Sequence, residues 1–258
     1  MQSSHSLSLS PPSPCRIPTT SKPSIPSLTP LTPRPRPDDL YRAPLALPRR
    51  LILPAASSIW DAIAGANPAR DASAAVRRGM QLFRQGDVSG SLVEFDRAIE
   101  LDPRQKAYLW QRGLSLYYLD RFEEGAEQFR LDVAANPNDT EESIWCFLCE
   151  ARVYGVEEAR KRFLEVGRDP RPVMREAYDM FRDGGDPEKL VSGFVDGRDD
   201  ERFYASLYAG LCYESQKNIE GAKLHIIAAC RSPYGSRSHD YMAYLARVHC
   251  SCRNWSVS

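Results

Sequence analysis

The stretch FDRAIELDPRQ, residues 95–105, combines a helical pattern with an abrupt stop. Phe95 and Ala98 are apolar and lie three residues apart, with charged residues between and around them, which is typical of an amphipathic helix. Pro103 then ends the helix, because proline lacks a backbone N–H and restricts the residue before it. A second stretch, QFRLDVAANPND at 128–139, has the same design. The sequence therefore predicts two helices that end in the same way.

The same residue types return at a spacing of 34 positions. The matching sets are Gly79 with Gly113, Phe95 with Phe129 and Phe163, and Pro103 with Pro137. A fixed period of this length predicts stacked helical hairpins. The glycines remove a side chain where two helices cross closely, and each Phe fills the space between the helices. Small residues four positions before each Phe (Ser91, Gly125 and Ala159) serve the same close approach.

These residues resemble the tetratricopeptide repeat (TPR) family, whose pattern is W-x2-L-G-x2-Y, then A-x3-F, then P. The resemblance implies an all-α, right-handed superhelix of helical hairpins. Three units are expected within 72–171, at about 72–105, 106–139 and 140–171. The first keeps Gly79, Phe95, Ala98 and Pro103, the second Gly113, Phe129 and Pro137, and the third Ala159 and Phe163.

The later part of the chain continues the pattern less regularly. Residues 172–202 resemble a short, divergent hairpin, and 203–236 a further repeat that keeps Gly210 and Ala222. Residues 237–250 are expected to form a helix that covers the open end of the array, and 251–258 a tail. The unit order is similar to that of a bacterial TPR lipoprotein that scaffolds cell-wall peptidases. Cys15 follows SLSPPSP rather than an apolar signal, so the lipid anchor is not carried over.

The resemblance also implies a binding face. In TPR arrays the first helix of each unit lines the concave surface, and aromatic residues are common interface anchors. The corresponding residues are Val76, Met80, Phe83, Trp110, Leu114, Tyr117, Tyr118, Ile144, Leu148 and Arg152. We expect a groove for a helix or an extended peptide, although the same residues could instead form covered core. The carboxylate clamp of TPR domains that bind chaperone C-termini is absent, because its positions correspond to Val76, Met80, Gln111, Glu141 and Trp145.

Charge and composition narrow the partner class. The chain has 34 basic and 34 acidic residues, and its first 50 residues hold seven basic and two acidic ones. Residues 51–258 are therefore mildly acidic, which argues against nucleic acid as the main partner. No apolar run reaches the ~20 residues of a membrane span. We expect a protein or peptide partner and no integral membrane segment.

Residues 1–37 contain nine Ser, four Thr and ten Pro, with four basic residues and no acidic one. Such a segment cannot bury enough surface to fold, so a disordered tail is one interpretation. The other is a plastid transit peptide, expected over 1–50, because the segment is Ser-rich, basic and acid-poor. A linker or a lumen-targeting signal of the twin-arginine kind is expected over 51–71, after Arg49-Arg50. The predicted location is the chloroplast stroma or thylakoid surface, with the thylakoid lumen as the alternative.

The chain shows few signs of enzyme chemistry. It has no P-loop and no G-x-G-x-x-G motif,. We predict a non-catalytic adaptor without a cofactor or metal, which could help to assemble or maintain a thylakoid complex. One alternative is a zinc- or thiol-dependent protein that uses Cys146 and Cys149, or the cluster His249, Cys250 and Cys252. The other is a repeat protein that associates with itself.

Overall fold

The computed structural model describes residues 67–257, and this part of the chain is helical and contains no strand. The predictions for 1–66, the transit peptide and most of the lumen-targeting segment, lie outside the described residues. The helices are α2 Pro68–Arg84, α3 Val88–Leu101, the 3₁₀ helix η1 Pro103–Tyr108, α4 Trp110–Tyr118, α5 Phe122–Ala135, α6 Thr140–Tyr154, α7 Val156–Lys161, α8 Pro172–Asp183, α9 Pro187–Gly193, α10 Asp199–Ser215, α11 Ile219–Arg231, α12 Pro233–Arg237 and α13 Tyr241–Cys252. The expectation of an all-α protein is thus met over 67–257.

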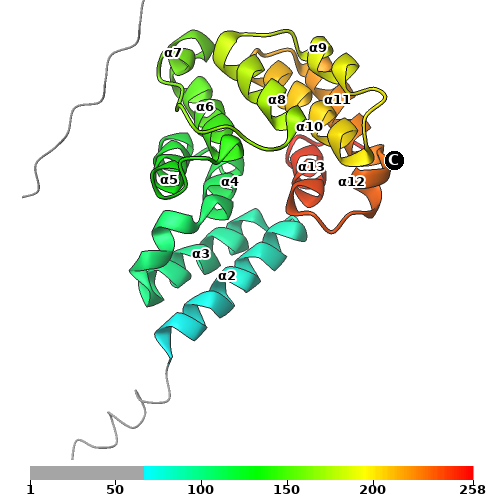
Figure 1. Ribbon diagram of the computed structural model, residues 1–258. Helices are drawn as coiled ribbons and strands as arrows, with labels where there is room; N and C mark the ends of the chain where they lie inside the picture. The colour runs from blue at the N-terminus through cyan, green and yellow to red at the C-terminus, as the bar shows by residue number, and fades with distance from the viewer. Residues whose placement is uncertain (1–66, 258) are drawn as a thin grey trace, which may run out of the picture. The chain divides into compact units, whose positions relative to one another are not determined.

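Consecutive helices pack as hairpins, and the same kind of turn joins several of them (Figure 1). After α2, the Asp87 N–H donates to the Leu82 carbonyl at 3.0 Å. After α4, the Arg121 N–H donates to Leu116, which lies 34 positions beyond Leu82, at 2.9 Å. This bond closes a helix end when one residue adopts positive φ. Gly86 (φ 87°) and Asp120 (φ 58°) are those residues, so the repeat extends to the turns.

The predicted glycines lie where the helices of a hairpin touch. A Cβ atom at Gly79 would lie 2.6 Å from the Phe95 ring, and one at Gly113 would lie 2.6 Å from the Phe129 ring. Gly210 faces Ile226 in the same way, at 2.7 Å. These distances are too short for any side chain. The close contact between the two helices therefore explains why these positions carry glycine.

The other residues predicted to shape the repeat have varied surroundings. Ala98, Ala159 and Ala222 are fully buried. Pro103 begins η1 instead of a plain loop, and α5 ends at Ala135, before Pro137. Asp139 caps α6, since its carboxylate accepts from the N–H groups of Glu141 and Glu142,.

The third predicted unit departs from the pattern. Its second helix, α7, has only six residues and ends at Lys161, so Phe163 lies beyond it. Residues 163–171 continue without helix and contain Gly167 and Pro170, and Pro172 begins the next helix, α8,. Phe163 still packs near the rings of Phe147 and Tyr178, with centroids 5.7 and 5.2 Å away. The aromatic contact is kept although the helix that should carry it is short.

The C-terminal helix α13 does not simply cover one end of the array. It packs against α11 and α12 of the last hairpin and also against α2 of the first (Figure 1). Its apolar residues include Leu245 and Ala246, both fully buried. The expected end cap is therefore a helix that bridges the first and last hairpins. Residues 253–257, expected as a tail, follow it, and the Trp255 ring lies 5.3 Å from that of His249.

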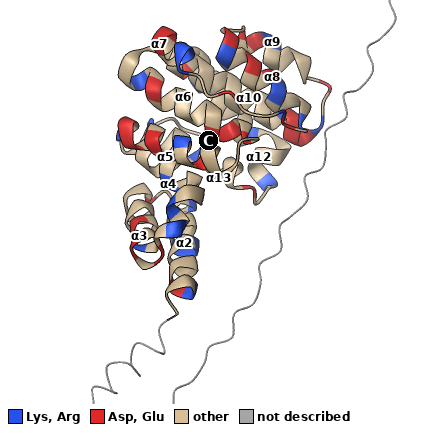
Figure 2. Cartoon of the chain, turned by 60° about the vertical axis from the view of Figure 1, so that its left-hand side comes forward, with Lys and Arg blue, Asp and Glu red and all other residues tan. Residues whose placement is uncertain are grey.

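Basic and acidic residues are interspersed along the described helices (Figure 2). Many form local pairs within one helix, such as Lys161 with Glu158 in α7. Such exposed pairs contribute little to stability. Among residues 67–257, no helix is long and apolar enough to cross a membrane.

Candidate functional site

The ten residues predicted to line a binding groove come from α2, α4 and α6, but most of them are interior. The buried ones are Phe83, Leu114, Tyr117, Tyr118, Ile144 and Leu148. Val76, Met80 and Trp110 are half-buried, and only Arg152 is exposed. The prediction of an open aromatic groove is wrong for this arrangement, because the chain's own helices cover it.

Helix α13 supplies much of that cover. The Tyr241 ring stacks on Phe83, with centroids 5.2 Å apart and an interplanar angle of 16°. Trp110 meets the same Tyr241 ring edge-on, also at 5.2 Å. Further along α13, His249 Nδ1 lies 3.1 Å from the Tyr118 hydroxyl. The aromatic residues expected to anchor a partner thus anchor the protein's own last helix.

A buried polar network ties α13 to α4 and α10. The Tyr117 hydroxyl donates to Glu214 Oε2 at 3.2 Å, and Arg253 Nε donates to Glu214 Oε1 at 2.5 Å. His249 Nε2 lies 3.6 Å from Glu214 Oε2. Because Glu214 has a charged donor and a hydroxyl donor, its buried carboxylate is compensated. Removing one partner would leave a buried charge without its counterpart.

Burial controls ionisation within this network. It lowers the pKa of His249 to about 4, so the imidazole is neutral near neutral pH,. Burial also opposes ionisation of Glu214, but His249 together with the hydrogen bond and the charge of Arg253 outweighs it and lowers the pKa of this carboxyl. The network therefore contains one ion pair and a neutral imidazole at neutral pH.

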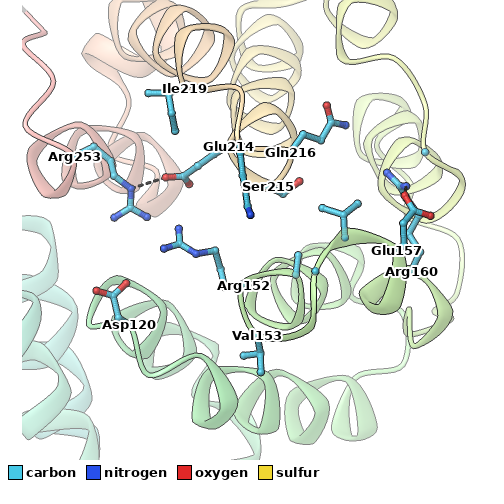
Figure 3. A pocket seen from close by; sticks show the side chains of 15 residues that line it. Asp120, Arg152, Val153, Glu157, Arg160, Glu214, Ser215, Gln216, Ile219 and Arg253 are labelled. Carbon is cyan, nitrogen blue, oxygen red and sulfur yellow. Dashed lines mark hydrogen bonds and ion pairs between the residues drawn. The ribbon is translucent and has the colours of Figure 1, made fainter.

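Beside this network lies a cleft of about 1110 Å³, which we call the basic cleft (Figure 3). Its lining comprises Asp120, Ala151, Arg152, Val153, Gly155, Val156, Glu157, Arg160, Gly184, Glu214, Ser215, Gln216, Lys217, Ile219 and Arg253. These residues lie at the C-terminal ends of α6, α10 and α13, in α7, at the start of α11 and in the turns that follow α4, α6, α8 and α10. Helix C-termini carry partial negative charge and favour nearby cations. Arg152 and Arg253 occupy such positions.

The lining of the cleft has four basic side chains and three acidic ones, Asp120, Glu157 and Glu214, and not all of these charges are paired. Arg160 donates to Glu157 at 2.8 Å, and Arg253 is paired with Glu214. Arg152 forms no ion pair with any residue of 67–257, and its guanidinium lies 4.8 Å from the centroid of the Phe122 ring. Lys217 likewise has no ion pair within the described chain. Figure 3 shows the Arg152 guanidinium extending into the cleft toward Glu214 and Arg253.

Of the cleft's charged residues, only Arg152 was among those predicted to bind. Lys217 and Arg160 lie at or near hairpin ends, and Arg253 lies in the segment expected to be a tail. Neither the 34-residue period nor an amphipathic pattern selects such positions. The signal that remained was the clustering of basic residues at helix C-termini, which becomes meaningful only once the helices are placed together.

The cysteines fall into two groups. Cys146 and Cys149 are buried within α6, and burial raises the pKa of Cys146 to about 11. Their thiols are therefore poor nucleophiles. Cys230 of α11 and Cys250 of α13 are also buried, with their sulfur atoms 3.9 Å apart. Among residues 67–257 no group of three or more His, Cys, Asp or Glu side chains is placed to hold a metal ion.

The positions of the missing carboxylate clamp are occupied in other ways. Glu141 accepts from Arg171 at 2.7 Å and from the Tyr208 hydroxyl at 2.7 Å, and Trp145 is buried.

No protein-family model matches this chain.

Proposed function

We propose that this protein is a non-catalytic adaptor built from TPR-like hairpins, and that it binds an acidic segment of a partner protein in the basic cleft. The repeat assignment is supported by the glycine–aromatic contacts at Gly79 and Gly113 and by turns of one kind at Gly86 and Asp120. Both pairs are 34 residues apart. The structural unit of such arrays is a helical hairpin, and three or more of these hairpins stack with short connections between them.

The observation that carries the binding proposal is Arg152, a cation that extends into a large cleft and forms no ion pair with any residue of 67–257, although its charge acts on Glu214. Lys217 lies in the same lining, also without an ion pair. A carboxylate or a run of carboxylates would supply the missing charge, and Arg can bind a carboxylate through two parallel hydrogen bonds. The cleft, of about 1110 Å³, lacks the aromatic walls predicted for the groove.

The location remains as the sequence suggests. We place the protein in the chloroplast, at the stroma or thylakoid surface or in the lumen, where it would help to assemble or maintain a thylakoid complex. The composition of residues 1–50 supports this proposal,. Immunoblotting of fractionated chloroplasts would test it, and a cytosolic or secreted protein would contradict it.

The binding proposal is tested with the full-length chain and fluorescent peptides of about ten residues rich in Asp and Glu. We expect R152E/K217E to weaken peptide binding by about tenfold or more, because it reverses the two unpaired cations. The matched control R77E/R237E makes the same charge change at exposed residues outside the cleft and should bind like wild type. Fluorescence anisotropy at two salt concentrations measures the affinities.

Two results would contradict this function. One is equal loss of binding in both double variants, which would mean that net charge alone attracts the peptide. The other is absence of binding by the wild-type protein to any acidic peptide at low salt. Circular dichroism checks that all variants keep their helix content.

A thiol-dependent role is the second candidate, and the pair Cys230 and Cys250 favours it over a role for Cys146 and Cys149. Cys230 and Cys250 belong to different helices, and the hydrogen bond between their thiols lowers the pKa of Cys250. Treatment of the native protein with a disulfide oxidant, followed by peptide mapping, tests this candidate. A Cys230–Cys250 cross-link would support it, and cross-links found only after unfolding would exclude it.

A further inference from the structure

A second cavity, of about 210 Å³, lies at the opposite ends of the helices that reach the basic cleft. We call it the acidic pocket. Its lining comprises Trp110, Phe129, Asp139, Glu141, Glu142, Trp145, Tyr204, Asp240, Tyr241 and Met242. These residues come from α4, α5, α6, α10 and α13 and from the residues that precede α6 and α13. The lining thus has four carboxylates, five aromatic rings and no Lys or Arg.

Three of the four carboxylates already have structural tasks. Asp139 caps α6, and Asp240 caps α13 and accepts from the Tyr204 hydroxyl at 2.8 Å. Glu141 is paired with Arg171. Glu142 is different, because it forms no ion pair with any residue of 67–257 and its Oε2 atom has no hydrogen-bond partner there. Only 6% of Glu142 is exposed, so bulk solvent reaches this carboxyl poorly,.

Two neighbouring side chains are left incomplete in the same way. The Trp145 Nε1–H and the Tyr241 hydroxyl have no hydrogen-bond partner within the described chain, although Trp145 is 2% exposed and Tyr241 6%. Buried polar atoms are nearly always hydrogen-bonded, in native proteins, to protein, water or ligand. Three incomplete groups on the wall of one cavity therefore mark it as a place where something polar is accommodated.

The lining of this cavity has no positively charged side chain to balance its carboxylates. Burial, aided by the nearby carboxylates of Asp139, Asp132 and Glu141, raises the pKa of Glu142 to about 9. Arg171, the partner of the neighbouring Glu141, is shared between Glu141 and Asp169. Arg84 lies 5.4 Å from the centroid of the Tyr241 ring and Arg171 lies 5.6 Å from that of Tyr204, but neither forms an ion pair with Glu142. Without a ligand, Glu142 must hold a proton at neutral pH.

The walls of the cavity suit an organic cation better than a metal ion. Trp110 and Tyr241 meet edge-on with centroids 5.2 Å apart, and Trp145 lies in the same lining. Aromatic faces attract ammonium and guanidinium groups through their quadrupoles. A metal ion would require several convergent oxygen ligands, but three of the carboxylates are engaged in caps or ion pairs.

We propose that the acidic pocket binds an organic cation, an ammonium or guanidinium group, held against Trp110 and Tyr241 with Glu142 as its counter-ion. Such a group can arrive as a free small molecule or as the side chain of a Lys or Arg in a partner protein. This site is distinct from the basic cleft and does not depend on the function proposed for it.

The test uses isothermal titration of the full-length protein with N-acetyl-arginine amide, with tetramethylammonium and with a capped peptide that has one central Arg. N-acetyl-citrulline amide serves as the uncharged isostere of the arginine probe. We expect the cations to bind and the citrulline probe to bind at least about tenfold more weakly. A peptide that binds more tightly than the single residue identifies a protein side chain as the natural ligand, and equal affinities identify a small molecule.

The variant E142Q keeps the size of the side chain but cannot form a carboxylate, and we expect it to weaken cation binding by about tenfold or more. The matched control E123Q alters an exposed glutamate outside the pocket and should bind like wild type. At about pH 7.5, titration in two buffers of different ionisation enthalpy should show that wild type releases a proton on binding and that E142Q does not.

The proposal is overturned if no cation binds at millimolar concentration, if citrulline binds as well as arginine, or if E142Q binds like wild type. Because E142Q conserves the shape of a side chain that is protonated and neutral at neutral pH, it is expected to fold. W110A provides a second variant at a half-buried position, where loss of binding with unchanged helix content would support the aromatic contact.

Discussion

The two ends of the helices α6, α10 and α13 differ in the charge that they leave unmatched. Their N-terminal ends meet at the acidic pocket, where Glu142 is buried without a counter-ion in residues 67–257. Their C-terminal ends meet at the basic cleft, where Arg152 is exposed and also lacks an ion pair. The two residues lie ten positions apart on α6, about 15 Å along its axis,. One set of helices therefore presents two sites of opposite sign.

The comparison also separates structural from functional charge. Acidic residues at helix N-termini and basic residues at C-termini complement the helix dipole, which explains Asp139, Asp240 and Arg253. The helix dipole does not explain why Glu142 is buried without a partner in residues 67–257, because an exposed carboxylate at the same helix end would complement the dipole equally well. Glu142 carries the cost of burial, whereas Arg152 remains hydrated. The acidic end should therefore respond strongly to protonation, and the basic end to salt.

The largest effect should come from weakening α13, which contributes to both ends. Leu245 is fully buried on this helix. We expect L245A to destabilise the protein by about 2–5 kcal/mol through lost burial and a cavity. Urea unfolding followed by circular dichroism measures the change. A loss below about 1 kcal/mol would mean that α13 is not part of the cooperative core.

The next effect is acid sensitivity at the basic end. The pKa of His249 is about 4 in the folded protein, against about 6.5 when unfolded, so the unfolded chain binds more protons between these values,. Its contribution to stability is complete above pH 6.5 and falls by about 3 kcal/mol as the pH drops to 4. Urea midpoints across this range should show the fall in wild type and a shallower slope in H249F. Equal slopes would contradict the buried neutral imidazole.

Glu142 should act in the opposite sense at the acidic end. Its folded pKa of about 9 exceeds the unfolded value of 4.5, so the folded state holds the extra proton and stability falls as pH rises,. Between about pH 7 and pH 9 we expect wild type to lose about 2 kcal/mol relative to E142Q. Parallel curves for the two proteins would show that Glu142 ionises freely, and would remove the main argument for an unmet charge.

The smallest effect on stability should come from Arg152 itself. Since its side chain is exposed and unpaired, R152A should change the free energy of unfolding by less than about 0.5 kcal/mol. The same variant should weaken binding of an acidic peptide while leaving binding of N-acetyl-arginine amide at the acidic pocket unchanged. A parallel loss of both ligands would mean that the two ends are coupled and not independent.

The sequence carries clear information about the hairpins. The 34-residue spacing of Gly79 with Gly113 and of Phe95 with Phe129 predicts which helices touch, because a close crossing requires glycine opposite a large ring. The spacing of these residues does not predict that α7 is short. Ala159 and Phe163 match the pattern by type, yet the helix ends at Lys161 between them. Matching residues at two positions do not guarantee that the backbone between them is one helix.

The predicted groove shows a second limit of prediction from the sequence. Trp110, Tyr117 and Tyr118 share one face of α4, as predicted from their spacing, but that pattern is the same whether a partner or the chain's own helix covers the face. Tyr241 and His249 are the residues that decide the matter, and they lie more than 120 positions away. Glu142 was overlooked for a related reason, since a glutamate in the first turn of a helix is ordinarily an exposed, dipole-stabilising residue.

Helix α13 both fills the predicted groove and completes the two sites, so its packing decides whether either site exists. Amide hydrogen exchange of the full-length protein measures that packing. We expect the amides of residues 245–249 to exchange as slowly as those in the middle of α6, since both segments are buried,. Rapid exchange of α13, at the rate of the exposed residues of α9, would contradict it and would return the aromatic face to the role of an open groove.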